Sequence, residues 1–226
     1  MTLTVLHLDQ HLVAIDKPPG LLVHRTQLAA GEDEAALQLL RDQLGRTVWP
    51  VHRLDRGTSG VLLFALSAEV ASLLGAMFEQ GLMDKRYLAL VRGWPGEDQG
   101  LIDHPLARDP ELPSAGQNML DAQTRWRVLK RLEWPIATDP RFATTRVALL
   151  EAEPLQGRRH QIRRHLKHIA HPILGDATHG KGPLNRAVAA HLGVQRLWLH
   201  AEQLRLMHPV SGMALALQAA PGAGWP

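Results

Sequence analysis

Hydrophobic residues recur along the chain with two spacings, one typical of strands and the other of helices. Short apolar runs, continuous or alternating with polar residues, predict strands at 4–9, 11–16, 49–51, 61–66, 85–93, 101–103, 123–133, 146–153, 196–207 and 214–217. Apolar residues at helical spacing predict helices over 32–44, 68–80 and about 157–169, and a short one over 187–192. Many strands with few helices and no internal repeat predict an α+β fold with a mixed, largely antiparallel sheet and flanking helices.

Proline and glycine mark where these elements are interrupted. Lys17-Pro18-Pro19-Gly20 ends the second strand, and residues 96–122, rich in proline, glycine and acids, predict a surface excursion. Residues 180–183 are expected to form a flexible basic loop, and residues 219–226 a frayed end. No segment has the composition of a linker, so the 226 residues are expected to form a single domain.

The polar stretch His52-Arg53-Leu54-Asp55-Arg56-Gly57-Thr58-Ser59-Gly60 lies between two apolar segments. Its two glycines permit the positive φ of a sharp connection, and its hydroxyls can bond the amides of the turn. Asp55 then has two interpretations, a side chain that caps the turn or an ionised acid directed at a polyanionic substrate. The neighbouring arginines favour the second, because a turn cap needs no guanidinium groups beside it.

A second concentration of charge lies in the helix predicted near 157–169. At about 100° per residue, Ile162, Leu166 and Ile169 form its buried stripe. Arg163 lies at the border of this stripe and Arg164 nearly opposite, so the two arginines cannot share a role. Arg163 suits a partner for a buried or half-buried carboxylate, whereas Arg164 suits solvent or phosphate. The alternative for Arg163 is an ordinary surface arginine.

Composition excludes several classes of chemistry. The chain has no cysteine, and neither a Walker pattern nor a dinucleotide fingerprint occurs. Histidines at 160, 165, 168 and 171 have no carboxylate between them and many cations beside them, so no metal site is expected. The net charge of +3 and pI of about 9.7 are compatible with RNA. The sequence has neither a secretory signal nor a membrane-length apolar run, which predicts a cytoplasmic protein.

Five ordered blocks resemble the RluA-type pseudouridine synthases. His52-Arg53-Leu54-Asp55-x-x-Thr58-Ser59-Gly60 is similar to the catalytic motif of that family. The other blocks are Lys17-Pro18-x-Gly20, Lys85-x-Tyr87, Gly157-Arg158-x-His160-Gln161-Ile162-Arg163-x-His165 and His171-Pro172-Ile173-Leu174-Gly175-Asp176. The resemblance runs from Thr4 to about Gly212, and it implies the pseudouridine synthase fold with a central active-site cleft.

This resemblance implies an isomerisation without a cofactor, in which uracil leaves C1′ of ribose through N1 and rejoins it through C5. Asp55 would attack C1′, or would stabilise and deprotonate the sugar as uracil departs. Arg163 would pair with Asp55 and keep it ionised. Tyr87, the only tyrosine, would stack on the uracil and help remove the C5 proton. The alternative for Tyr87 is packing in the core.

The resemblance also implies that the target uridine is flipped out of its RNA stem. By analogy, Arg53 would fill the vacated space, with His52 and Thr58 of the same motif also at the substrate. Ile173 and Leu174 would line the apolar wall of the pocket. Arg25, Arg158 and Arg159 are candidates for phosphate contacts.

Within the family, the resemblance is nearest to the enzymes that act on uridine-65 of tRNA. Residues 20–25, 144–146, 179–180, 185–186 and 192–197 carry this finer likeness. A ribosomal RNA substrate is one alternative, and a non-catalytic RNA-binding module on the same scaffold is another. The chain is expected to be a monomer without an obligatory protein partner or membrane contact. No S4-like RNA-binding module is expected before the catalytic domain.

Overall fold

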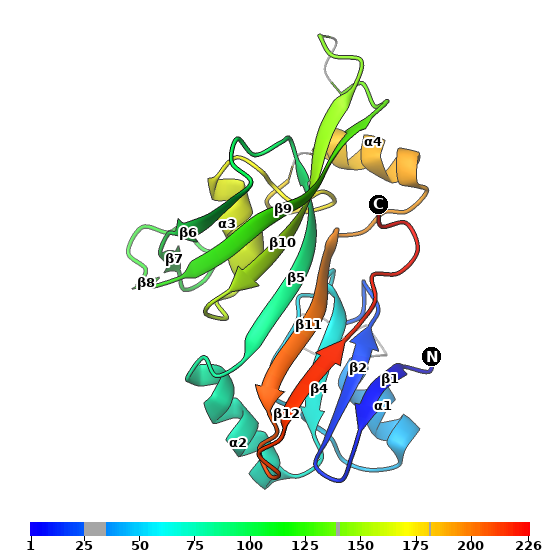
Figure 1. Cartoon of the computed structure of the whole chain (residues 1–226), viewed down its shortest axis with the longest axis vertical. Coiled ribbons are helices and arrows are strands. Elements are labelled where there is room, and N and C mark those ends of the chain that lie inside the picture. The colour runs from blue at the N-terminus through cyan, green and yellow to red at the C-terminus, as the bar shows by residue number, and fades with distance from the viewer. Residues whose placement is uncertain (25–34, 139–140, 181) are drawn as a thin grey trace. The chain divides into compact units, whose positions relative to one another are not determined.

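The chain folds into two compact units in a computed structural model, which describes residues 1–24, 35–138, 141–180 and 182–226 (Figure 1). The first unit comprises Met1–Lys85 and His200–Gly222, and the second comprises Arg86–Leu199 and Ala223–Pro226. The boundary falls within two strands, β5 (Asp84–Arg92) and β11 (Leu199–Met207). The chain therefore passes between the units without a linker segment.

The first unit is a sheet flanked by two helices. Its strands β1 (Thr4–Leu8), β2 (Leu12–Lys17), β4 (Ser59–Ala65) and β11 are neighbours in that order. Strand β3 (Trp49–Pro50) pairs with β4, and β12 (Ala214–Gln218) pairs with β11. Only β4 and β11 are parallel among these pairs. Every residue of β4 is buried, as expected for a continuous apolar run at the centre of a sheet.

Helices α1 (Ala36–Leu44) and α2 (Ala68–Glu79) belong to the same unit. The hydroxyl of Ser67 accepts the amide of Val70 and so caps α2, as the sequence predicts. Val70 and Leu74 on α2 pack with Leu12 and Leu63 of the sheet in one core cluster. Helix α1 ends at Gly45 in the left-handed conformation, which its sequence also predicts.

The second unit is an antiparallel sheet covered by helix α3 (Gln161–His168). Its strands run in the order β5, β10 (Thr145–Pro154), β9 (Gln123–Trp134) and β6 (Gln99–Asp103). Strands β7 (Leu106–Ala107) and β8 (Met119–Leu120) form a separate pair within the predicted excursion. Helix α3 packs on β9 and β10, and α4 (Gly182–Leu192) contributes Leu184 and Val188 to the core of this unit.

The α+β class and the largely antiparallel sheet are confirmed, but two local predictions are wrong. Helix α4 begins at Gly182, inside the predicted loop, because Pro183 is well suited to the first turn of a helix. The predicted frayed end is also ordered. Ala219 is 2% exposed and donates its amide to Glu202, and the Trp225 ring contacts the Trp198 ring edge-on at 5.4 Å.

No helix in the described part of the chain is long and apolar enough to cross a membrane.

Candidate active site

Asp55 lies in a tight turn that leads directly into β4. The Thr58 amide donates to the Asp55 carbonyl at 3.0 Å, which closes the turn. Leu54 and Thr58 are buried on either side, whereas the Asp55 side chain is half-buried. The turn therefore holds the Asp55 backbone by its buried neighbours and leaves its carboxylate partly exposed to solvent.

Gly60 is required where this turn joins the sheet. It has φ 106°, and a Cβ at this position would lie 2.2 Å from the carbonyl oxygen of Ala201 on the parallel neighbour β11. The predicted positive φ is confirmed for Gly60. It is wrong for Gly57, which is not among the described residues with positive φ, because the Asp55–Thr58 turn does not need that conformation.

A buried hydrogen-bonded chain fixes the start of β4. His200 donates from Nε2 to the Ala219 carbonyl at 2.9 Å, so its Nδ1 accepts the Ser59 hydroxyl at 2.8 Å. Ser59 and His200 are 4% and 1% exposed. This chain joins the end of the Asp55 turn to β11 and to the residue that follows β12.

Lys17 is a second anchor of the turn, and its role was not predicted from the sequence. Its side chain is fully buried, and Nζ donates to the carbonyls of Pro18, Leu21 and Arg56 at 2.9, 2.8 and 3.1 Å. A buried ammonium requires such acceptors. The ammonium therefore ties the loop after β2 to the residue next to Asp55. The available signal was a lysine in an apolar strand immediately before Pro-Pro-Gly.

His52 anchors the other end of the motif. Its Nε2 accepts the Leu63 amide at 3.0 Å, and its ring stacks on Phe78 of α2. Burial, with a smaller contribution from the charge of Lys85, lowers the pKa of His52 to about 3. His52 is therefore neutral at physiological pH and acts as an acceptor inside the first unit. A contact between His52 and the substrate stays a prediction.

The two arginines of the motif have different surroundings. Arg53 is exposed, as the predicted role in replacing a flipped base would require. Arg56 is also exposed, but its Nε donates to the Gly20 carbonyl at 3.0 Å, and its own carbonyl accepts the Gly20 amide at 2.9 Å. Arg56 thus joins the turn to the loop that Lys17 also holds.

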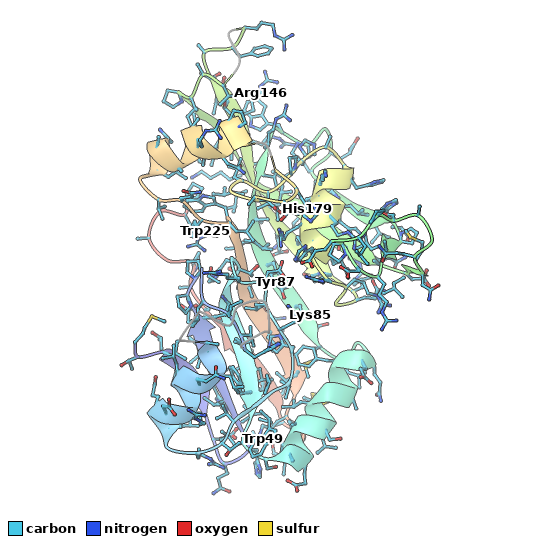
Figure 2. All side chains as sticks on the ribbon, turned by 180° about the vertical axis from the view of Figure 1, so that it is seen from behind. Trp49, Lys85, Tyr87, Arg146, His179 and Trp225 are labelled. Atoms are coloured by element: carbon cyan, nitrogen blue, oxygen red, sulfur yellow. The ribbon has the colours of Figure 1, made fainter. Side chains whose placement is uncertain are left out.

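Tyr87, labelled in Figure 2, lies on β5 in the second unit. Its cross-strand partner is Ala152 of β10. It is half-buried and packs against the core of this unit. Thr124, which bonds Gln161 and His165 of α3, lies on the same face of the sheet, since it is two residues from the Ala152 partner Trp126. Tyr87 and α3 therefore share one face of the second unit.

Arg163 on α3 is more buried than its helical position predicts, with 8% of its surface exposed. Its guanidinium forms a bidentate pair with Asp176, from Nε to Oδ2 at 2.8 Å and from Nη2 to Oδ1 at 2.9 Å. Burial alone would raise the pKa of Asp176, but the hydrogen bond and charge of Arg163 hold it below the usual range. Asp176 thereby fixes the plane of the guanidinium. The predicted pairing of Arg163 with Asp55 stays a prediction.

The loop that carries Asp176 is itself closely fixed. Asp176 Oδ1 accepts the amides of Thr178 and His179, both at 2.9 Å, and its carbonyl accepts Asn185 Nδ2. Gly175 has φ 74°, and a Cβ there would lie 1.7 Å from the Arg196 carbonyl oxygen. The Gly-Asp pair therefore serves to place a carboxylate against Arg163, a role that sequence reasoning did not assign.

Ile173 and Leu174, predicted to line an apolar wall, are each 1% exposed and belong to the core of the second unit. The Leu174 amide donates to the Leu90 carbonyl at 2.9 Å, and Ile173 forms a bridge with Val91. They thus attach the segment before Asp176 to β5, the strand of Tyr87. Their contact with a substrate stays a prediction.

The predicted phosphate ligands of the second unit already have protein partners. Arg158 Nε donates to the Asp121 carbonyl at 3.0 Å. Arg159 pairs with Asp109 and Glu111, which lie in the excursion between β7 and β8. Arg25 lies outside the described residues. Phosphate contacts by these three arginines stay predictions, and those of Arg159 would compete with two carboxylates.

The histidines near α3 are used for packing and hydrogen bonding. His165 bonds the Thr124 hydroxyl and the His104 carbonyl, and His168 stacks on His104 with centroids 3.8 Å apart. His171 Nδ1 bonds the Arg92 carbonyl. His179 lies edge-on to His160, and burial lowers its pKa to about 4 despite the Asp176 carboxylate nearby. No cluster suited to a metal ion occurs among the described residues.

Comparison with known proteins decides the family to which these motifs belong. The family described as RNA pseudouridylate synthase matches residues 11–168, which include Lys17, Asp55, Tyr87 and Arg163. The chain belongs to the RNA pseudouridylate synthase family. It is accordingly an isomerase that converts uridine in RNA to pseudouridine, as the five ordered motifs predict.

Curated relatives extend the similarity over nearly the whole pseudouridylate synthase chain. The tRNA pseudouridine synthase C of Vibrio cholerae is 46% identical over 99% of this chain and 93% of the relative. The proteins of the same name from Pasteurella multocida and Salmonella typhimurium are 45% and 44% identical. The match to the Pasteurella multocida protein covers 100% of this chain and 94% of that protein. The match to the Salmonella typhimurium protein covers 99% of this chain and 87% of that protein.

Two solved structures support the fold. Human RNA Pseudouridylate Synthase Domain Containing 1 superposes with a TM-score of 0.76 at 25% identity, over 97% of this chain and 84% of its own. Human RNA Pseudouridylate Synthase Domain Containing 4 gives a TM-score of 0.71 at 25% identity, over 97% and 89%. The pseudouridine synthase fold predicted from the sequence is thereby confirmed.

Proposed function

We propose that this pseudouridylate synthase modifies tRNA, and that its target is uridine-65. The observation that carries the proposal is the similarity to several tRNA pseudouridine synthase C proteins at 42–46% identity over nearly their whole lengths. The finer motifs at residues 20–25, 144–146 and 192–197 support it. We further propose that the protein acts as a monomer in the cytoplasm, within a single catalytic domain formed by both units.

Asp55 is the catalytic acid in this proposal. The N1–C1′ bond breaks, the uracil turns, a C5–C1′ bond forms, and the proton lost from C5 is replaced by one at N1. Asp55 either attacks C1′ or stabilises and deprotonates the sugar while the uracil is detached. Its position in a turn anchored by Gly60, Ser59 and Lys17 supports a role that requires a fixed carboxylate.

Arg163 and Tyr87 complete the proposed site. Arg163 would pair with Asp55 while Asp176 holds its Nε and Nη2. Tyr87 would stack on the flipped uracil and assist removal of the C5 proton. Their common face in the second unit supports this joint role.

The residues around the substrate follow the same proposal. Arg53, which is exposed, would fill the space left by the flipped base, with His52 and Thr58 in the same motif. Ile173 and Leu174 would support the apolar wall, and Arg25, Arg158 and Arg159 would contact phosphates.

The experiment uses two tRNA transcripts. One has uridine at position 65, and the other has cytidine there, with the pairing partner changed so that the base pair is kept. Incubation with the purified chain, followed by chemical mapping of pseudouridine, is expected to give one modified position in the first transcript and none in the second. Modification of ribosomal RNA but of neither transcript would replace the proposed substrate. Modification of no RNA would favour a non-catalytic RNA-binding module.

A further inference from the structure

A hollow of about 580 Å³ lies in the second unit over β6, β9 and β10, away from the residues assigned to catalysis. Residues paired across these strands share a face, so Gln99, Arg127 and Glu151 form one row. Leu101, Arg125 and Glu153 form the next row on the same face. The hollow thus has a floor of charged side chains on three adjacent strands.

A buried carboxylate organises the arginines of this floor. Glu151 is 6% exposed, and it accepts Arg127 Nε at 2.6 Å and Arg127 Nη2 at 3.1 Å. Arg86 Nε lies 3.1 Å from the same carboxylate, but it is buried and makes no hydrogen bond. Two guanidinium groups are therefore held beside one another before any ligand binds, which reduces the entropy lost on binding.

Arg125 supplies the positive charge that the floor leaves unmatched. It is exposed, and its side chain makes no hydrogen bond or ion pair among the described residues. The three arginines of the hollow against its two glutamates leave one net positive charge. An internal phosphodiester of RNA carries one negative charge and accepts the paired N–H bonds that guanidinium groups offer.

This floor faces away from Tyr87. Ala152, the partner of Tyr87, lies between Glu151 and Glu153 on β10 and so points to the opposite face. Helix α3 packs on the Tyr87 face, as Figure 1 allows the reader to follow. Strand β6 is the edge of this sheet, next to β9.

We propose that the hollow formed by Arg86, Arg125 and Arg127 around Glu151 binds a phosphodiester of the RNA substrate. The contact fixes the RNA on the protein and reads no base, because its donors match phosphate geometry. The identity of the RNA as tRNA rests on the proposed function. The proposal that this hollow binds phosphate does not rest on the proposed function.

The test measures the Kd of an unmodified tRNA transcript at several salt concentrations, and the single-turnover rate at saturating protein. Arg125→Ala leaves the Glu151 pairs intact. It is expected to raise Kd roughly tenfold, to reduce the salt slope by about one, and to leave the saturated rate unchanged. Arg205→Ala, an equal loss of charge at an exposed strand position of the first unit, is the matched control. Equal Kd values and slopes for these two variants would overturn the proposal.

Glu151→Gln separates an organised site from general charge. Removing a negative charge would tighten RNA binding if only net charge mattered. If the carboxylate holds the arginines in place, the same change instead weakens binding, by several-fold. Tighter binding by this variant would contradict the proposal.

The result is independent of catalysis. If the wild type forms no pseudouridine but Arg125→Ala still weakens tRNA binding, the proposed function fails and the phosphate site stands. If the wild type is active and Arg125→Ala behaves as Arg205→Ala does, the phosphate site fails and the proposed function stands.

Discussion

At the scale of single residues, the motif around Asp55 divides into side chains that hold the turn and one that is presented by it. Lys17 and Ser59 are buried and bonded inside the first unit, whereas the Asp55 side chain is half-buried. Buried polar groups of this kind specify one conformation because each loses a bond if the turn moves. In the proposed mechanism Asp55 carries out the chemistry, and its buried neighbours fix its position.

His52 should make the protein less stable as the pH is lowered below neutral. The pKa of about 3 in the folded protein lies below the ordinary histidine pKa of 6.5, so between these values the unfolded chain takes up a proton that the folded chain does not. The contribution of neutral His52 to the free energy of unfolding is therefore complete above pH 6.5. Below that pH it falls by up to about 1.4 kcal/mol per pH unit. Urea unfolding of His52→Gln at pH 7, 5.5 and 4.5 should show a difference from wild type that narrows with acidity. A difference that does not vary with pH would contradict this assignment.

Tyr87 should separate binding from proton transfer. Tyr87→Phe keeps the aromatic ring but removes the hydroxyl, so we expect the Kd for tRNA to stay within about twofold while product formation falls at least tenfold. Single-turnover measurements at saturating protein make the comparison. Unchanged product formation would remove the acid–base part of the proposed role and leave stacking.

At the scale of elements, the central contact is between α3 and the loop after it. Arg163 is held by Asp176, and Asp176 is held by the amides of Thr178 and His179. The direction of Arg163 is therefore set by a segment thirteen residues away in sequence. A displacement of about 1 Å in a catalytic partner can reduce a rate by about 100-fold.

Asp176 and Arg163 should act as one unit in catalysis. Asp176→Asn retains an acceptor for the loop amides but loses the charge, so we expect kcat to fall about 100-fold with KM for tRNA nearly unchanged. Arg163→Lys removes the bidentate pair and should have a similar effect. On the Arg163→Lys background, Asp176→Asn should cause little further loss of kcat. If the losses of kcat in the two single variants instead multiply in the double variant, Asp176 only stabilises the fold.

The sequence predicts these elements well but not the contacts that join them. Apolar spacing located β4, α2 and the β9–β10 pair, because periodicity reports which face of an element is buried. It placed Arg163 at the border of a stripe, but it could not show Asp176 as its partner. The bond from Lys17 to the Arg56 carbonyl spans 39 residues, and periodicity carries no information about such pairing.

Two further differences have similar causes. Helix α4 was predicted to start too late because Gly-Lys-Gly-Pro is typical of a loop when read alone. The end of the chain was predicted to fray because its composition is that of a free terminus. Tertiary contacts decide both cases. Leu184 and Val188 of α4 pack in the core, and Trp225 at the end of the chain contacts Trp198.

At the scale of the whole molecule, the proposed reaction draws on both units. Asp55 belongs to the first unit, whereas Tyr87 and Arg163 belong to the second. Strands β5 and β11 each contribute residues to both units. The mechanism requires that all three side chains act on one uridine.

Release of tritium from tRNA labelled at uracil C5 tests this account most directly, since C5 loses its hydrogen only when the new glycosidic bond forms there. Wild-type protein should release one equivalent per tRNA labelled only at uridine-65, and Asp55→Asn should release none while binding the same tRNA with a similar Kd. Asp55→Glu should also lose most activity, because its carboxylate lies one methylene farther from the turn. Comparable release by wild type and Asp55→Asn would contradict the account.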